Sequence, residues 1–289
     1  MKYLILGASG MAGHMIALYL MEEGHNVTGF CRNKLPHFCC IEGDASDRDL
    51  IRKIITQGKY DAVVNAIGIL NNSAESHKAE AIYLNSFLPH DLALIAKDLE
   101  TQIIQISTDC VFRGNTGPYD ENSIPDGYSW YDRTKALGEL SDAKNLTLRQ
   151  SIVGPDLKCK GIGLLNWFIN QEDTKISGYM NSIWTGLTTL ELAKGIEACS
   201  KSKIVGLVNL VPNASISKYE LLVLFNKYFK NGNITIEPTA NDYLDKTLIN
   251  SRKDIPFHPK DYSLQIAELR DWVSSHPGLY PNSYYRYIS

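Results

Sequence analysis

The sequence predicts an α/β protein in which a doubly wound parallel sheet is followed by a smaller, mixed α/β C-terminal region. Along the first half of the 289-residue chain, short apolar runs alternate with stretches of helical periodicity. The apolar runs lack polar alternation, which is typical of strands buried on both faces of a parallel sheet. Repeated strand–helix alternation favours the doubly wound arrangement. From Gly154 onward the alternation loosens, and a different layout is expected there.

The elements of the first half can be placed from these patterns. The expected strands are Lys2–Leu6, Asn26–Cys31, Asp61–Asn65, Gln102–Ile106 and Leu146–Arg149, with a weaker apolar patch at Phe38–Ile41. The expected helices are Met11–Glu23, Arg48–Gln57, Glu80–Asp98 and Tyr128–Ser141. Gly24 suits the C-terminal cap of the first helix, and Asp47 suits the N-terminal cap of the second.

The second half has fewer strand signals. We expect a short helix near Leu164–Asn170, a strand at Leu207–Leu210, and helices at Leu190–Ser200, Lys218–Lys230 and Leu264–Ser274. Residues 1–155 are therefore predicted to form an NAD(P)-binding domain that also takes in roughly residues 183–205. Residues 156–289 are predicted to form mainly a substrate-binding domain.

Composition and charge exclude several classes of protein. The formal net charge is -3, so no strong basic field favours nucleic acid or an acidic membrane surface. The six cysteines show no C-x-x-C spacing with matching histidines, which favours reduced thiols over a zinc site. No window approaches the roughly 20 apolar residues of a membrane helix, and the N-terminal apolar run is too short for a signal peptide. A cytoplasmic location is expected.

A glycine-rich turn lies between the first expected strand and the first expected helix. Gly7-Ala8-Ser9-Gly10-Met11-Ala12-Gly13 spells G-x-x-G-x-x-G. Residues without a Cβ let the backbone approach a pyrophosphate, and the helix that follows presents free N–H groups and a positive dipole end. This pattern predicts a Rossmann-like dinucleotide site with contacts from Gly7, Ser9, Gly10, Met11 and Gly13. A tight turn without a ligand is the alternative.

The end of the second strand bears on the choice of cofactor. An acidic residue there would hold the ribose 2′-hydroxyl and favour NAD. This chain has Arg32 and Lys34 instead, which can pair with a 2′-phosphate. NADP is therefore the predicted cofactor and NAD remains open. The alternative is a pair of solvated surface cations.

Tyr131 and Lys135 form a Y-x-x-x-K pattern on a predicted helix. The spacing places both side chains on one helix face. An ammonium beside a phenol lowers the phenol pKa, which suits a proton donor near neutral pH. The pattern arises often by chance in a chain with 16 tyrosines. Here, however, Ser107-Thr108-Asp109 follows the Gln102–Ile106 strand, at the sheet edge where doubly wound folds bind ligands.

Together these residues resemble the extended short-chain dehydrogenase/reductase superfamily. The segments Ser107–Gly114, Gly117–Glu121 and Tyr131–Glu139 are similar to those of dTDP-4-dehydrorhamnose reductases and related sugar-nucleotide enzymes. The resemblance runs from Met1 to about Val211 and more faintly beyond. It implies NAD(P)H-dependent reduction of the 4-keto group of a nucleoside-diphosphate-linked 6-deoxyhexose, in the synthesis of cell-surface polysaccharide precursors.

The resemblance also implies roles for individual residues. Tyr131 would be the general acid, Lys135 would tune its pKa and hold a ribose, and Thr108 would orient the keto group. Further cofactor contacts are implied for Asp44, Ala66, Ile67 and Gly68, and for Asn85, which would support the lysine. The candidate substrate contacts are Asp109, Val111, Asn166, Trp167, Trp184 and Arg252, with Lys246 and Asn250 as weaker candidates.

Some features depart from the family pattern and leave other functions open. Asp132 stands where relatives commonly have glycine, and Cys110 replaces a common tyrosine. Some relatives carry metal-binding glutamates at a dimer interface, but the first helix here has His14-Met15 at that place, so no metal is predicted. Glu22, Glu23 and Glu191 are not excluded as ligands, and a homodimer remains open.

Two other functions compete with reduction. The first is a sugar-nucleotide epimerase or dehydratase, which the lack of a glutamate after Thr108-Asp109 weakens. The second is a non-catalytic NADP-binding regulatory subunit, because the overall pattern also resembles the methionine adenosyltransferase regulatory β subunit.

Overall fold

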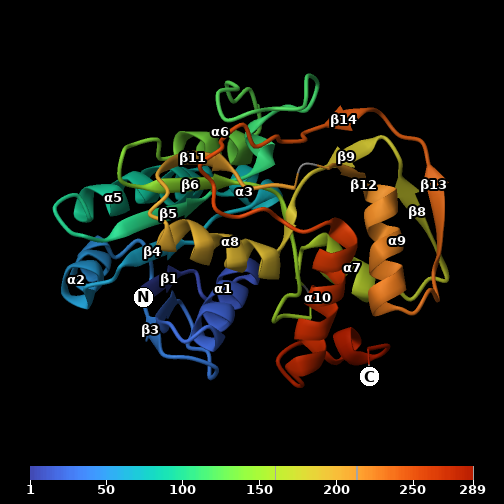
Figure 1. Cartoon of the computed structure of the whole chain (residues 1–289), viewed down its shortest axis with the longest axis horizontal. Helices are drawn as coiled ribbons and strands as arrows, with labels where there is room; N and C mark the ends of the chain where they lie inside the picture. The colour runs from blue at the N-terminus through green and yellow to red at the C-terminus, as the bar shows by residue number, and fades with distance from the viewer. Residues whose placement is uncertain (160, 213, 289) are drawn as a thin grey trace.

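A seven-stranded parallel sheet lies at the centre of the protein, in a computed structural model that describes residues 1–159, 161–212 and 214–288 (Figure 1). The strand order is β11-β6-β5-β4-β1-β2-β3, so the direction of winding reverses between β1 and β4. The predicted doubly wound parallel sheet is confirmed. Its strands are β1 (Lys2–Leu6), β2 (Asn26–Cys31), β3 (Cys40–Glu42), β4 (Ala62–Asn65), β5 (Gln102–Ile106), β6 (Leu146–Arg149) and β11 (Gly206–Asn209).

The helices around the sheet follow the predicted order with three main differences. They are α1 (Met11–Glu22), α2 (Arg48–Gly58), α3 (Asn71–Ser76), α5 (Leu88–Ile95), α6 (Trp130–Leu137) and α8 (Thr189–Lys201). Helix α3 was not predicted, and α6 is shorter than the Tyr128–Ser141 helix that was expected. The helix expected over Glu80–Asp98 is instead α4 (Lys78–Ala81), a π-helical turn η1 (Ile82–Phe87) and α5. Pro89 has no N–H to give to the carbonyl of Asn85, which interrupts the regular hydrogen-bond ladder at this point.

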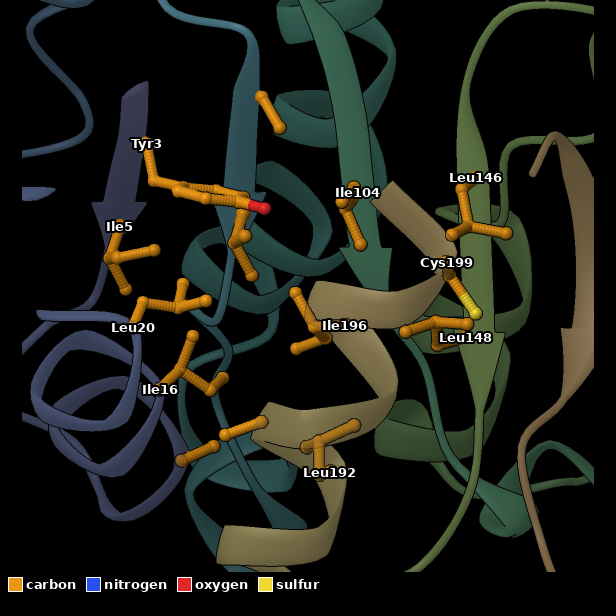
Figure 2. Packing of buried hydrophobic residues seen from close by; sticks show 14 of the residues in the cluster. Tyr3, Ile5, Ile16, Leu20, Ile104, Leu146, Leu148, Leu192, Ile196 and Cys199 are labelled. Carbon is orange, nitrogen blue, oxygen red and sulfur yellow. The ribbon is translucent and has the colours of Figure 1, made fainter. Parts of the chain in front are cut away.

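Both faces of the sheet are apolar and covered by helices. On one face, Tyr3 and Ile5 of β1 and Leu146 and Leu148 of β6 pack under α1 and α8. Figure 2 shows this layer, with the labelled side chains of α1 and α8 meeting those of the strands. On the other face, alternate strand residues such as Leu4 and Leu6 join α2 and α5 in a second core. This two-sided burial explains the continuous apolar runs of the sequence.

The second half of the chain builds a mixed region with its own core. Its helices are α7 (Leu164–Ile169), α9 (Lys218–Phe229) and α10 (Tyr262–Ser275). Its strands, which make small separate sheets, are β7 (Ile152–Val153), β8 (Lys175–Tyr179), β9 (Ser182–Trp184), β10 (Leu187–Thr188), β12 (Ile216–Ser217), β13 (Thr235–Thr239) and β14 (Leu244–Asp245). Phe168, Phe225 and Leu269 lie in the core of this region, which Figure 1 shows beside the large sheet.

Two segments of the second half return to the first. Helix α8 packs against α1, and β11 extends the large sheet beyond β6. This arrangement is compatible with assigning residues 183–205 to the cofactor half. The domain boundaries themselves stay predictions.

Candidate active site

The glycine turn between β1 and α1 is shaped by close backbone contacts. Gly7 has a φ of 79°, and a Cβ there would lie 3.0 Å from the carbonyl carbon of Ala66. A Cβ at Gly13 would lie 2.1 Å from the Gly7 carbonyl oxygen, so α1 can start this close to the turn only with glycine. Gly10 caps α1, and no side chain of the described residues caps that helix end. The first N–H groups of α1 therefore remain available to an anion.

The carboxyl end of β2 carries exposed cations. Arg32 and Lys34 are both exposed, and neither forms an ion pair with another described residue. Nearby, the Asp44 carboxylate accepts hydrogen bonds from the Ser46 backbone N–H (2.8 Å) and hydroxyl (2.7 Å). These hydrogen bonds lower the pKa of Asp44, and the charge of Arg32 lowers it further. Arg32 and Asp44 therefore share one side of the predicted adenosine site.

The segment after β4 is held in place by two buried asparagines. Asn65 accepts a hydrogen bond from the Ile67 N–H at 3.2 Å, which fixes the Ala66–Gly68 backbone. Asn85 bonds both the N–H and the carbonyl of Ile69 at 2.9 Å, and its Nδ2 donates to Thr134 Oγ1 at 3.1 Å. Asn85 thus reaches the residue before Lys135, not the lysine itself.

Helix α6 carries Tyr131 and Lys135 on a buried face. A capping box starts the helix: Ser129 Oγ accepts from the Asp132 N–H, and the Asp132 carboxylate accepts from the Ser129 N–H. Asp132 is therefore the N3 partner of the capping box, a role that a glycine side chain could not fill. Tyr131 is 8% exposed and Lys135 is 5% exposed.

The two side chains are not coupled in the way that their spacing predicts. Lys135 Nζ donates to the backbone carbonyl of Ile106 at 2.6 Å, and burial lowers its pKa to about 8. Burial raises the pKa of the Tyr131 phenol, while a polar contact with Thr108 lowers it. The expected lowering of the Tyr131 pKa by Lys135 is therefore not seen, because desolvation dominates and the ammonium is directed at a carbonyl.

A buried ion pair lies behind Lys135. Arg149 is bidentate to the Glu139 carboxylate, with Nε at 2.9 Å and Nη2 at 2.6 Å. Ser107 Oγ donates to the same carboxylate at 2.6 Å. The negative charge of Glu139 raises the pKa of Lys135 and so opposes the effect of burial. No role had been predicted for Glu139, which follows the end of α6 and its C-cap Gly138.

The Thr108–Val111 loop lies at the carboxyl end of β5. Thr108 accepts from the Cys110 N–H at 3.2 Å and starts the short 3₁₀ helix η2 (Asp109–Val111). Asp109 and Val111 are buried. Burial raises the pKa of the Asp109 carboxyl, and the charges of Lys218 and Lys246 oppose this shift. Lys218 comes from α9 in the second half and was missed as a site residue; only its place at the start of a predicted helix marked it.

The remaining substrate candidates lie in different places. The Asn166 amide is used within the chain, since Nδ2 donates to the Gly161 carbonyl at 2.6 Å and Oδ1 accepts from the Tyr284 hydroxyl at 3.1 Å. Trp167 is 43% exposed on α7. Trp184 is buried, and its ring lies 4.9 Å from Lys218 Nζ, which brings it close to the Asp109 loop.

Arg252 lies at the opposite edge of the sheet. Its guanidinium pairs with Asp254 and donates to the carbonyls of Val205 (2.6 Å) and Leu207 (3.2 Å). Val205 precedes β11, so these contacts lie at the amino ends of the strands, whereas Thr108 and Tyr131 gather at the carboxyl ends. The structure therefore does not bring Arg252 to the other candidates.

Several side chains considered for metal binding have other partners. Glu191 pairs with Lys194 at 3.4 Å, Glu22 with His276 at 2.6 Å, and His14 bonds the Gly10 carbonyl at 2.8 Å. Within the described ranges, no group of three or more His, Cys, Asp or Glu residues is placed to hold a metal ion. All six cysteines are free thiols. No helix in the described part of the chain has the length and apolar character to cross a bilayer.

Comparison with known sequences finds one family model over the first half of the chain and relatives that align with about half of it. The family model described as RmlD substrate binding domain matches residues 1–153. The probable low-salt glycan biosynthesis reductase Agl14 of Haloferax volcanii is 32% identical over 47% of this chain and 46% of its own length. A dTDP-4-dehydrorhamnose reductase of Streptomyces griseus is 32% identical over 48% of this chain and 43% of its own length.

A third relative is not named as a reductase. Methionine adenosyltransferase 2 subunit beta of Xenopus laevis is 28% identical over 50% of this chain and 43% of its own length. The alignments with these three relatives each cover less than half of the relative's length.

Comparison with solved structures covers nearly the whole chain. A dTDP-4-dehydrorhamnose reductase from Clostridium acetobutylicum superposes with a TM-score of 0.79 at 21% identity, covering 95% of this chain and 100% of the other. The same enzyme from Bacillus anthracis, in complex with NADP, gives 0.80 at 17% identity, covering 95% and 99%. At such identities the likeness establishes the fold alone.

Proposed function

The chain belongs to the RmlD substrate binding domain family, and on this premise we propose that it is an NADPH-dependent reductase of a nucleoside-diphosphate-linked 4-keto-6-deoxyhexose. The observation that carries the proposal is the buried face of α6, where Tyr131 and Lys135 lie beside Thr108 at the carboxyl end of β5. Relatives with names of this kind, such as the Haloferax and Streptomyces reductases, support it.

The cofactor side of the proposal follows from the glycine turn and the cations after β2. A Cβ at Gly7 or Gly13 would collide with neighbouring backbone, so the close turn requires glycine, and the free N–H groups of α1 suit a pyrophosphate. Arg32 and Lys34 would hold the 2′-phosphate of NADPH, while Asp44 and the Ala66–Gly68 segment would line the adenosine and the rest of the cofactor. Lys135 would hold a ribose, with Asn85 fixing the backbone around it. When bound, the nicotinamide supplies the hydride.

The proton would come from Tyr131. Because burial raises its pKa, the phenol stays protonated at neutral pH, which is the state a general acid needs before reduction. The Thr108 hydroxyl would donate a hydrogen bond to the keto oxygen and orient it toward the phenol. Asp109, Val111 and Trp184 would form the wall on the substrate side, and the exposed Trp167 would offer a face for stacking a base. Asn166 would act indirectly, by shaping the turn at Gly161.

Epimerase or dehydratase chemistry has less support from the site. A dehydratase needs a second acid or base beside the hydroxyl, and Cys110 occupies that place. Burial raises the pKa of the Cys110 thiol to about 12, so it stays neutral near pH 7. A neutral thiol is a poor base.

The wider setting is also proposed. A cytoplasmic homodimer that makes precursors of surface polysaccharides would suit a relative named as a glycan biosynthesis reductase and another, from Bacillus subtilis, named as a spore coat polysaccharide biosynthesis protein. Residues 1–155 with 183–205 would bind the cofactor, and the rest of 156–289 would bind mainly the sugar nucleotide.

A substrate panel tests the proposal. NADPH consumption would be followed with dTDP-, UDP- and GDP-linked 4-keto-6-deoxyhexoses, and at least one should be reduced in step with NADPH loss. Epimerised product without net NADPH loss would support an epimerase instead. NADPH binding without turnover of any sugar would support a regulatory subunit.

A further inference from the structure

Helix α9 brings one lysine from the second half of the chain to the candidate active site. Lys218 is the first residue of α9, and a capping box between Ser217 and Glu220 sets this helix start. The preceding strand β12 pairs with β9, so that Ile216 lies opposite Trp184. This pairing holds the Lys218 ammonium 4.9 Å from the centre of the Trp184 ring. The pairing of β12 with β9 and the capped start of α9 therefore fix the position of Lys218.

The ammonium is partly buried and lacks a direct acceptor. Lys218 is half-buried, and burial lowers its pKa to about 8. Asp109 and Cys110 are close enough to influence its charge. Yet no described residue accepts a hydrogen bond from Nζ or lies within ion-pair distance of it. A desolvated ammonium with unused donors is costly unless a ligand supplies the acceptors.

The surrounding charges indicate which acceptor would fit. Lys218 and Lys246 both act on the buried Asp109 carboxylate. The Asp132 carboxylate acts on the neighbouring Cys110 and Tyr131. The Trp184 ring stabilises a cation but neutralises no charge. The unused donors of Lys218 favour an anionic ligand group, because charged acceptors form stronger hydrogen bonds with an ammonium than a neutral hydroxyl does.

We propose that Lys218, assisted by Lys246, binds the diphosphate of the nucleotide sugar and so sets how far the sugar reaches toward Tyr131. The proposal rests on the proposed function for the identity of its ligand. It gives the second half of the chain a defined contribution: one lysine on α9 that recognises the diphosphate. Lys218 is a specificity residue in this scheme and takes no part in proton transfer.

Equilibrium binding of nucleoside diphosphates tests the subsite without requiring turnover. The full chain, saturated with NADP⁺, would be titrated with dTDP, UDP, GDP and the corresponding nucleosides. We expect at least one diphosphate to bind the unaltered protein, and Lys218→Met to bind it roughly ten- to a hundredfold more weakly. Binding of the matching nucleoside should change little. Lys218→Arg should recover part of the affinity, since it keeps the charge.

The matched control is Lys227→Met, which removes an exposed lysine from the same helix and should leave diphosphate affinity unchanged. NADP⁺ affinity in both variants reports whether the fold is intact. Unaltered diphosphate affinity in Lys218→Met would overturn the proposal, as would an unaltered protein that binds none of the three diphosphates. Lysine-dependent diphosphate binding without reduction of any keto sugar would contradict the reductase and leave the subsite standing.

Discussion

Two lysines line the candidate active site, one from each half of the chain: Lys135 is buried and Lys218 is half-buried, and they differ in their contacts. Lys135 on α6 donates to the Ile106 carbonyl at 2.6 Å and has the Glu139 charge behind it. Lys218 on α9 lies over an aromatic ring and finds no acceptor among the described residues. Burial lowers both pKa values to about 8.

Lys135 is already bonded within the protein, whereas the donors of Lys218 are unused. A lysine whose ammonium is already bonded to the backbone is fixed in position before any ligand arrives, which suits a residue that orients a cofactor and a phenol. A lysine with unused donors gains most of its interaction energy from the ligand, which suits recognition. The first half would thus supply the chemistry, and the second half would select the substrate.

The largest effect on activity is expected for Tyr131, on the buried face of α6. Replacing Tyr131 by Phe removes the proposed proton donor and should lower kcat by roughly 10²–10⁴-fold, with little change in NADPH affinity. Steady-state kinetics and cofactor titration measure the two quantities. Tyr128→Phe, which changes an exposed tyrosine three residues away, is the control. A near-normal kcat in Tyr131→Phe would contradict the hypothesis that Tyr131 is the proton donor.

The next effect concerns cofactor choice at the end of β2. Arg32→Ala should raise KM for NADPH by about ten- to a hundredfold, because a charge-assisted contact with the 2′-phosphate is lost, and should affect NADH far less. Arg52→Ala, an exposed arginine on α2, serves as the control. Equal effects on the two cofactors would show that Arg32 is only a solvated cation.

A smaller effect is expected from the charge behind Lys135. With a Lys135 pKa of about 8, activity should be retained below that pH and lost as pH rises through it. Glu139 is the charged group that acts on Lys135, and it raises this pKa. Glu139→Gln should therefore move the alkaline limit of kcat to lower pH, by about one unit.

The control for Glu139→Gln is Glu197→Gln, which removes a carboxylate that pairs with Lys201 on α8. It should change stability without moving the pH limit. If both variants shift the alkaline limit of kcat equally, or if neither does, Lys135 is not the group whose titration sets that limit. The proposed functional difference between Lys135 and Lys218 would then lack support.

The smallest effect is expected at Arg252. Because its contacts lie at the amino end of β11, Arg252→Ala should leave KM for the sugar nucleotide unchanged and lower the free energy of unfolding by about 1 kcal/mol. Substrate kinetics and urea denaturation check the two parts. A raised KM would restore the interpretation of Arg252 as a substrate contact and give the second half a further binding residue.

Much of the structure of the first half could be predicted from the sequence, because the carboxyl ends of parallel strands lie at the same edge of the sheet. Once Gln102–Ile106 is a strand, Thr108 must lie at the sheet edge where the glycine turn also lies. Tyr131 and Lys135 needed only helical spacing to share a face. The weak strand at Phe38–Ile41 and the π-helical turn at Ile82–Phe87 were harder, because they depend on pairing with β2 and on Pro89.

The side-chain contacts of the second half could not be predicted from the sequence, because packing between small sheets and helices decides them. Asn166 had the chemistry of a ligand contact, but Tyr284, far along the chain, occupies its carbonyl. Lys218 had no motif at all, and it reaches Asp109 only through the pairing of β12 with β9.

The amino-acid sequence by itself determined the doubly wound sheet, the glycine turn and the edge at which Tyr131, Lys135 and Thr108 would gather. These depend on local periodicity and on the common direction of parallel strands. Only the tertiary structure decided where each charge is directed: Lys135 toward a backbone carbonyl, Arg149 toward Glu139, Arg252 away from the site, and Lys218 into it. Side-chain partners depend on desolvation and on contacts between distant segments, and no short-range pattern records either.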